Sequence, residues 1–221
     1  MSEKSYIAIG DIHGCIQSIK ALLDELEQYN GRQYVFVGDY IDRGPDSRGV
    51  VDYLLDFRSD HDCIFLRGNH EQMLLDALDH GKDELWKVNG GDVALRSYGV
   101  KKAKDLPKDH LEFYRKTKMY YDTQEYFFVH AGIPPHITIE EATGNKKYEE
   151  QFLWERSHLN VMETPWEKTV VFGHTPRPHP INKDKMLGID TGCVYNSLGY
   201  GKLTAVLLPE QKFIQQYCID Q

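Results

Sequence analysis

The stretch YIAIGDIHG at residues 6–14 joins an apolar run to a polar turn that contains two glycines. The same arrangement returns as YVFVGDYIDRGP at residues 34–45 and as CIFLRGNHE at residues 63–71. After each turn, apolar residues recur at the spacing of an amphipathic helix, as in residues 15–29. Three successive strand, turn and helix units predict an α/β fold that begins with a largely parallel sheet.

The second half of the chain has a different texture. Residues 81–122 are polar, aromatic and mostly helical in pattern, with interruptions by glycine and proline. Strand-like apolar runs then return without long helices between them, at residues 126–129, 170–172, 186–189, 203–208 and 213–214. Crossover helices first and a closing series of strands predict two sheets packed face to face with helices outside.

The composition is that of a globular protein. Of the 221 residues, 41% are apolar and 27% are charged, which excludes a disordered or fibrous chain and allows a well-buried core. We therefore expect a single domain over residues 1–221, as a monomer or weak oligomer. The 26 basic and 34 acidic residues give a net charge of −8, which argues against nonspecific binding of nucleic acid.

The cysteines and the N-terminal residues indicate a compartment. Cys15, Cys63, Cys193 and Cys218 show neither a CxxC pair nor dense spacing, which argues against a zinc finger and against a disulfide framework. The first residues lead directly into an apolar run, and no apolar stretch has the length of a signal peptide or a bilayer span. We expect a reducing, cytoplasmic location without membrane association.

Each apolar run up to residue 172 ends in residues that can bind metal or transfer protons. In sheets with crossover connections these loops open on one edge, so their side chains are expected to meet there. The glycines beside them let the backbone turn sharply and approach a compact site. The candidates are Asp11, His13, Asp39, Asp42, Asn69, His70, His130 and His174.

The residue types of this set indicate a pair of metal ions. Singly, an aspartate after a strand is most often a turn or helix-capping residue. Together, aspartate, asparagine and histidine form an oxygen and nitrogen set that suits Mn, Fe or Zn better than Ca. Six ligands drawn from these candidates are too many for one catalytic ion. They suit two ions about 3.5 to 4 Å apart that share a carboxylate, as in phosphoester hydrolases.

Five motifs resemble, in order, the signature motifs of the phosphoprotein phosphatase family of calcineurin-like metallophosphoesterases. They are GDIHG at residues 10–14, GDYIDRG at 38–44, RGNHE at 67–71, HAG at 130–132 and GHT at 173–175. The chain length and WKVNGG at residues 86–91 are similar to the compact bacterial and phage members. The resemblance implies a β-sandwich of two mixed sheets flanked by α-helices, with a dinuclear metal site at one edge.

The resemblance also divides the ligands between the two metals. The ligands that it implies for one ion are Asp11, His13 and Asp39. Those that it implies for the other are Asp39, Asn69, His130 and His174, so that Asp39 bridges. We expect two divalent cations, with Mn²⁺ foremost and Fe or Zn as alternatives. A hydroxide between them is expected to attack phosphorus in line.

Arginine and histidine residues beside the ligands are expected to handle the phosphate. Arg43 and Arg67 lie within the second and third motifs and can bind phosphate oxygens with paired hydrogen bonds. Arg156, in the segment WER, resembles a further phosphate-binding arginine of the family. His70 directly follows a ligand, and the ordinary pKa of histidine, about 6.5, suits a general acid. Asp42 is the carboxylate expected to keep it protonated.

Three functions agree with these residues. The first expectation is a serine/threonine phosphoprotein phosphatase, extending to phosphotyrosine in a dual-specificity form, whose partner is a phosphoprotein or phosphopeptide. The alternative is a symmetrical bis(5'-nucleosyl)-tetraphosphatase, which residues 189–194 and 203–206 also resemble. That relative usually carries alanine in place of Asp42, so Asp42 favours the phosphatase. A noncatalytic scaffold on the same fold ranks last, because no ligand is missing.

Overall fold

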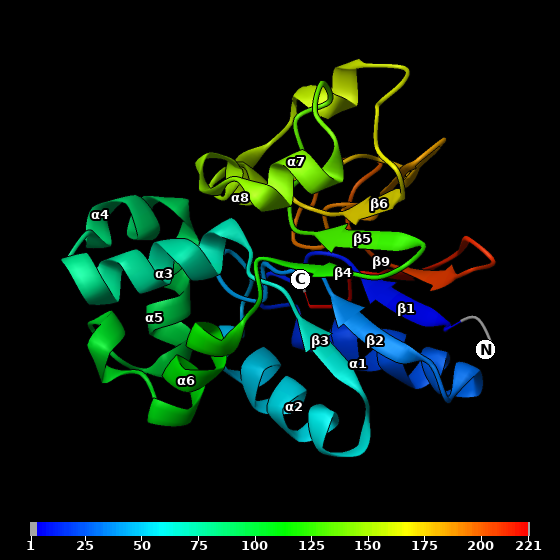
Figure 1. Ribbon diagram of the computed structural model, residues 1–221. Helices are drawn as coiled ribbons and strands as arrows, with labels where there is room; N and C mark the ends of the chain where they lie inside the picture. The colour runs from blue at the N-terminus through cyan, green and yellow to red at the C-terminus, as the bar shows by residue number, and fades with distance from the viewer. Residues whose placement is uncertain (1–3, 221) are drawn as a thin grey trace.

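The computed structural model describes residues 4–220 as two β-sheets packed face to face, with helices on the outside (Figure 1). The strand order is β10-β9-β1-β2-β3 in the first sheet and β4-β5-β6-β8-β7 in the second. The α/β sandwich of two mixed sheets expected from the sequence is thereby confirmed. Among residues 4–220, no helix combines the length and the apolar character that a bilayer span requires.

The first sheet is built from the repeated units at the start of the chain. The parallel strands β1 (Tyr6–Ile9), β2 (Gln33–Phe36) and β3 (Cys63–Phe65) lie side by side. Strand β9 (Lys202–Leu208) pairs antiparallel with β1, and β10 (Lys212–Tyr217) pairs antiparallel with β9. The C-terminal hairpin therefore completes the sheet that the N-terminal residues begin.

The second sheet has a parallel centre and two short antiparallel edges. The centre consists of β5 (Tyr126–Val129), β6 (Thr169–Phe172) and β8 (Met186–Gly188). The edges are β4 (Tyr120–Asp122) and β7 (Ile181–Lys183). Neither edge was expected, and β4 lies in the region predicted to be mostly helical. Unlike the equally short β3 and β8, these edges contain polar residues and belong to no apolar run, so their pairing depends on a neighbouring strand.

Helices cover the sandwich and form a lobe beside it (Figure 1). The crossover helices α1 (Ile16–Leu26) and α2 (Ser47–Asp60) lie beside the first sheet. Helices α7 (Ile139–Gly144) and α8 (Gln151–Trp154) lie over the second sheet. The lobe consists of α3 (Asn69–His80), α4 (Asp83–Trp86), α5 (Asp92–Tyr98) and α6 (Lys108–Lys116).

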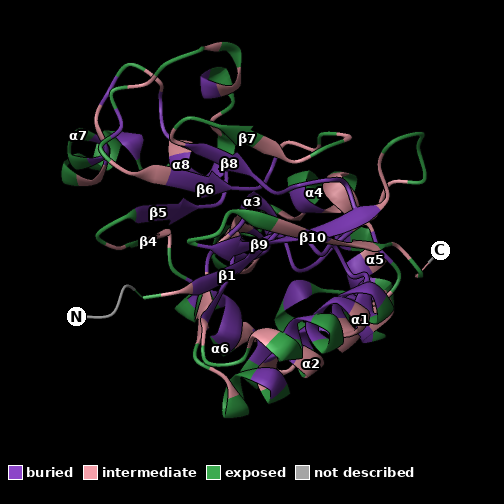
Figure 2. Ribbon diagram, turned by 90° about the vertical axis from the view of Figure 1, so that its right-hand side faces the viewer, coloured by how far each residue is buried: buried purple, intermediate pink, exposed green. Residues whose placement is uncertain are grey.

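Alternation of side chains along the strands builds three buried apolar layers. Ile7 and Ile9 of β1 belong to the layer that contains the apolar faces of α1 and α2. Tyr6 and Ala8 belong to the layer between the two sheets. Phe127 of β5 belongs to the layer under α7 and α8. Figure 2 shows the strands mostly buried and the exposed residues mostly on helices and loops. This packing holds the strand ends rigidly, and the candidate residues follow those ends.

Candidate active site

The loops after β1, β2, β3, β5 and β6 bring the predicted polar residues to one edge of the sandwich. Parallel strands of each sheet end at the same edge, so loops far apart in the sequence become neighbours. All eight candidates are buried there, namely Asp11, His13, Asp39, Asp42, Asn69, His70, His130 and His174.

The possible ligand atoms form two groups that share Asp39. In one group, donor atoms of His13, Asp39 and His70 lie within 4.8 Å of one another. In the other, donor atoms of Asp39, His130 and His174 do so. The two carboxylate oxygens of Asp39 lie 3.5 Å from His13 Nε2 and 3.5 Å from His130 Nε2, respectively. A carboxylate between two donor groups is the arrangement of a dinuclear site.

Asp11 and Asn69 lie in the same cluster. The carboxylate of Asp11 accepts the backbone N–H of His174 at 3.0 Å. The side-chain oxygen of Asn69 lies 3.0 Å from both His130 Nε2 and His174 Nδ1. The structure therefore brings together all six residues that the sequence nominates as ligands. It also places His70 beside His13, so the division of ligands between two ions stays an implication of the resemblance.

Two histidines donate a hydrogen bond through Nδ1 and therefore carry their lone pairs on Nε2. His13 Nδ1 donates to the carbonyl oxygen of Ile41 at 2.8 Å. His130 Nδ1 donates to the carbonyl oxygen of Val37 at 2.9 Å. A neutral imidazole then carries its lone pair on Nε2, so His130 Nε2 and the Asn69 oxygen are two acceptors in contact. A cation satisfies such a contact, and these residues therefore fit the divalent metals that the motifs imply.

Two of the predicted phosphate-binding arginines contact ligand histidines directly. Arg43 Nη1 lies 2.9 Å from His13 Nε2, and Arg156 Nε donates to His174 Nε2 at 3.1 Å. These guanidinium groups supply positive charge to lone pairs in the cluster. A neutral imidazole has one lone-pair nitrogen, so it cannot serve an arginine and a metal at once. A cation bound to these nitrogens would release both guanidinium groups, and phosphate binding by Arg43 and Arg156 stays a prediction.

Arg67, the third arginine, is held in another direction. Its guanidinium donates to Thr117, to Gln72 and to the carbonyl oxygen of Arg115, over 3.1 to 3.2 Å. Among residues 4–220, none of its hydrogen bonds reaches a ligand of the cluster. It instead lines a cavity between α3 and α8. Phosphate binding by Arg67 stays a prediction.

Burial controls the protonation of the cluster when no metal is bound. Burial raises the pKa of Asp39 to about 7, and it raises that of Asp11 well above the usual range, where the charge of Asp190 adds to the effect. Burial also lowers the pKa of His13 to about 3 and that of His130 to about 4. Bound cations favour the ionised carboxylates and the neutral imidazoles. Asp190, quoted in the sequence only within the motif of the alternative function, is thus a further buried carboxyl of this site.

His70 and Asp42 form a buried pair beside the ligands. His70 Nδ1 lies 2.7 Å from the Asp42 carboxylate, and neither side chain is exposed. Trp86 Nε1 donates to the same carboxylate at 2.9 Å. Among the described residues, His70 Nε2 has no hydrogen-bond partner, and the His70 ring stands edge-on to that of His13 with centroids 4.7 Å apart. An unpartnered ring nitrogen beside the ligands is placed to meet a substrate atom.

The pair keeps a proton on that nitrogen. Burial lowers the pKa of His70 and raises the pKa of Asp42. Both shifts disfavour a net charge, so the pair exists as a carboxylic acid with an imidazole or as a carboxylate with an imidazolium. The two forms hold the same number of protons, and in both Nε2 carries a hydrogen. His70 can therefore donate a proton although its own pKa is low.

The loops that carry the site have unusual backbone conformations. Residues other than glycine seldom adopt positive φ, which costs about 1 to 3 kcal/mol each and concentrates at functional sites. Gly38, at φ 110°, passes so close to His130 that a Cβ there would lie 2.9 Å from the ring. The site residues with positive φ are His13 (45°), Asp39 (52°), Asp42 (71°), Arg43 (67°) and His174 (66°).

Glu71 fastens two of these loops together, a role that the sequence analysis did not assign. Its buried carboxylate accepts the backbone N–H groups of Asp39 at 2.8 Å, Tyr40 at 2.9 Å and Gly68 at 2.9 Å. The loop after β2 is thereby tied to the loop after β3. The only signal in the sequence was the position of Glu71 as the last residue of the third motif.

The WKVNGG segment, residues 86–91, contacts Asp42 and Arg43. Trp86 holds the carboxylate of Asp42, as described above. Gly90, at φ 112°, packs against Arg43, since a Cβ at this position would lie 2.7 Å from the Arg43 nitrogen. The segment that is similar to compact family members therefore positions two candidate active-site residues in this chain.

Comparisons with known proteins agree with the geometry. A model of the calcineurin-like phosphoesterases matches residues 5–200. An asymmetrical bis(5'-nucleosyl)-tetraphosphatase of Oceanobacillus iheyensis is 29% identical over 93% of this chain and 89% of its own. Serine/threonine-protein phosphatase 1 of Salmonella typhimurium is 31% identical over 89% of this chain and 88% of its own. A crystal structure of a candidate diadenosine tetraphosphatase has a TM-score of 0.72 at 25% identity and covers 100% of this chain and 96% of that one. Similarity that runs through all five motifs makes this chain a member of the calcineurin-like metallophosphoesterase family.

Proposed function

We propose that this metallophosphoesterase hydrolyses dinucleoside tetraphosphates and cleaves them asymmetrically. The motifs alone favour a phosphoprotein, but the Oceanobacillus relative, which aligns with most of the chain, carries the name of an asymmetrical tetraphosphatase. The solved structure with a TM-score of 0.72 has a related name. The observation in the molecule that supports this proposal best is a cavity beside the metal ligands.

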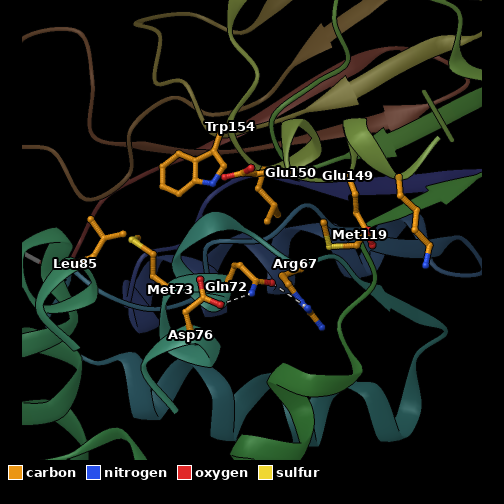
Figure 3. Close-up of a pocket in the computed structure, with 11 residues that line it drawn as sticks. Arg67, Gln72, Met73, Asp76, Leu85, Met119, Glu149, Glu150 and Trp154 are labelled. Atoms are coloured by element: carbon orange, nitrogen blue, oxygen red, sulfur yellow. Dashed lines mark hydrogen bonds between the residues drawn. The ribbon is translucent and has the colours of Figure 1, made fainter. Parts of the chain in front are cut away.

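The cavity lies between α3 and α8 and has a volume of about 510 Å³ (Figure 3). Trp154 and Glu150 line one side, and Gln72 and Asp76 line the opposite side. The indole of Trp154 stands edge-on to His174, with ring centroids 5.8 Å apart. The cavity therefore borders the metal ligands, and its volume is in the range of small-molecule sites.

The aromatic and polar side chains of the cavity suit a nucleoside. Trp154 is 40% exposed, so its indole is available to stack on a base. Asp76, Glu149 and Glu150 accept hydrogen bonds from ribose hydroxyls and base amino groups, and Arg67 and Lys146 supply positive charge to the same cavity. A nucleoside attached to a phosphate at the ligands can extend into this space.

Each part of the site then has a chemical task. Two divalent cations held by the six ligands, Mn²⁺ in this proposal, supply an activated water molecule and neutralise phosphate charge. Arg43 and Arg156, freed from the ligand histidines, bind phosphate oxygens with paired hydrogen bonds. His70 Nε2 donates its proton to the leaving oxygen, while Asp42 fixes the imidazole through Nδ1.

A phosphoprotein is the second candidate substrate, and the His70–Asp42 pair favours it. A serine alkoxide is a strong base and leaves poorly without a proton, whereas a nucleotide phosphate is a weak base. A general acid therefore matters more for a phosphomonoester than for a phosphoanhydride. The Salmonella relative is a serine/threonine-protein phosphatase by name.

Kinetics of the Mn²⁺-loaded protein on a panel of substrates test the proposal. The panel contains diadenosine tetraphosphate, a phosphoserine peptide and p-nitrophenyl phosphate, and anion-exchange chromatography identifies the nucleotides formed. We expect kcat/KM for the dinucleotide to exceed that for the peptide at least about tenfold, with AMP and ATP as products. Two molecules of ADP would show symmetrical cleavage, and a preference for the peptide would overturn the proposal.

A variant of the cavity tests where the nucleoside binds. Stacking on an aromatic side chain contributes about 1 to 3 kcal/mol, so Trp154→Ala should raise KM for the dinucleotide about 5- to 150-fold. The KM for a phosphoserine peptide without aromatic residues should not change, because this substrate carries no ring that can stack on Trp154. Tyr217→Ala is the matched control, since Tyr217 is an exposed aromatic residue at the end of β10. An unchanged KM in Trp154→Ala would remove the cavity from the binding site.

A further inference from the structure

Three of the four cysteines, far apart in the sequence, meet in the structure. Cys15 precedes α1, Cys193 lies in the loop after β8, and Cys218 follows β10. Their sulfur atoms all lie within 4.8 Å of one another, and those of Cys15 and Cys218 are 4.0 Å apart. Cys15 and Cys193 are buried, and Cys218 is half-buried. We propose that these three side chains bind one Zn²⁺ ion at a site separate from the active site.

The distances between the sulfur atoms suit zinc. A Zn–S bond of about 2.3 Å in a tetrahedral site places sulfur ligands about 3.8 Å apart. The 4.0 Å between Cys15 and Cys218 needs only a small contraction. Thiolates select zinc over manganese, whereas the active site offers nitrogen and oxygen atoms. The two clusters therefore select different cations.

A second cavity gives the cysteine site an entrance and room for a fourth ligand. It has a volume of about 360 Å³ and is lined by Cys15, Val194 and Asn196 among other residues. Three protein ligands leave one tetrahedral position, which a water molecule can fill from this cavity. Arg43 also borders the cavity, and Cys15 and Cys193 lie in the loops that carry His13 and Asp190, so the cysteine cluster adjoins the active site but uses none of its candidate ligands.

The thiols already interact with one another in the absence of metal. A hydrogen bond with Cys15 raises the pKa of Cys193, and one with Cys193 raises the pKa of Cys218. Zinc binds the deprotonated thiolates, so its binding releases the thiol protons and replaces the hydrogen bonds between the cysteines with bonds to the metal. Cys15 is also the N-cap residue of α1.

A zinc ion at this position ties together segments that frame the active site. Cys15 is two residues beyond His13, and Cys193 is three residues beyond Asp190. Asp220, two residues beyond Cys218, already accepts two backbone N–H groups at the start of α1. The ion therefore stabilises the fold and takes no part in hydrolysis, so this inference does not depend on the proposed substrate.

Cadmium titration of the full-length protein tests the site directly. The active site is first saturated with Mn²⁺, and Cd²⁺ is added while the ultraviolet charge-transfer absorption of cadmium thiolates is recorded. We expect one Cd²⁺ per chain, an absorption that corresponds to three thiolates, and loss of the band when Zn²⁺ competes. Zn²⁺ added to the Mn²⁺-loaded protein should also raise Tm.

Cysteine variants separate this site from the rest of the chain. Cys218→Ser, at a half-buried position, should weaken cadmium binding at least about tenfold and reduce the absorption per ion by a third. Cys193→Ser should do the same. Cys63→Ser is the matched control and should behave like the wild type, because Cys63 lies in β3 outside the cluster. No band, a band unchanged in both variants, or a disulfide among these cysteines without metal binding would overturn the proposal.

Discussion

His70 and His158 are both fully buried, yet their surroundings give them different properties. His70 lies at the edge of the sandwich among the metal ligands, with Nδ1 on Asp42 and Nε2 without a partner. His158 lies in the apolar region by β6, edge-on to Phe172 with centroids 4.6 Å apart, and neither of its ring nitrogens has a partner among the described residues. Burial lowers the pKa of both histidines. Burial makes an imidazole neutral, and a carboxylate partner together with an open nitrogen makes it a proton donor.

A third buried histidine, His110, has a hydrogen-bond partner on each of its two ring nitrogens. His110 Nδ1 lies 2.7 Å from the hydroxyl of Tyr98, and its Nε2 lies 2.9 Å from the carboxylate of Asp52. Like His70, it has an aspartate partner, but no nitrogen is left to meet a substrate. An aspartate beside a buried histidine is therefore not by itself a sign of catalysis.

The largest expected effect comes from removing the proton donor. His70→Asn should lower kcat for the phosphoserine peptide about 10²- to 10⁴-fold, with little change in KM, because the serine alkoxide is a strong base and departs without a proton. The loss should be smaller for diadenosine tetraphosphate, whose leaving group is a weaker base than an alkoxide. Steady-state kinetics at saturating Mn²⁺ measure both. An unaltered kcat on every substrate would end the role of His70, and an unchanged Tm would show that the variant is folded.

The second prediction concerns the pH dependence of stability at His158. Its folded-state pKa is about 4, and its ordinary value is 6.5, because burial disfavours the charged ring. Between these values the unfolded chain binds more protons, so the free energy of unfolding falls as pH falls from 6.5 towards 4. Protonation of His158 in the unfolded chain lowers the free energy of unfolding by about 2 kcal/mol at pH 5. The full decrease, reached once the pH is below the folded-state pKa, is about 3 kcal/mol.

His158→Leu isolates this contribution. Urea unfolding of the wild type and the variant at pH 7 and pH 5 gives the loss of stability on acidification for each. The wild type should lose about 2 kcal/mol more than the variant, since every other titrating group is common to both. Equal losses would show that His158 titrates normally in the folded state.

The smallest effect is expected at the fully paired histidine. The Tyr98 hydroxyl lies 2.7 Å from His110 and 2.8 Å from the hydroxyl of Tyr114. Tyr98→Phe leaves both buried groups short of a partner and should lower the free energy of unfolding by about 1 kcal/mol. Urea unfolding at neutral pH measures this change, and kcat on the same sample should match that of the wild type. A drop in kcat without a change in stability would place His110 among the functional residues.

The fold and the convergence of the candidate ligands could be predicted from the sequence because their signals are local. Each ligand follows an apolar run and lies beside a glycine, and the sheet brings the ends of parallel strands together. The short strands β4 and β7 were not predicted because their sequences, YYD and INK, contain polar residues and form no apolar run.

The directions of long side chains could not be predicted in the same way. Arg43 and Arg67 occupy similar places in their motifs, yet Arg43 contacts a ligand histidine and Arg67 is held by Thr117 and Gln72. A guanidinium group is far from its backbone, so its position depends on neighbours from other segments. The contact of Trp86 with Asp42 could not be predicted either, because the indole nitrogen also lies far from its backbone.

The α/β sandwich and the convergence of six candidate ligands, which are aspartate, asparagine and histidine, follow from local sequence, because strand periodicity and glycine turns are properties of consecutive residues. Only the tertiary structure decided that Cys15, Cys193 and Cys218 meet, although their spacing argues against a zinc finger. It alone placed the cavity with Trp154 beside His174. Such sites join residues separated by up to the whole length of the chain, and only packing of the completed sheets brings them into contact.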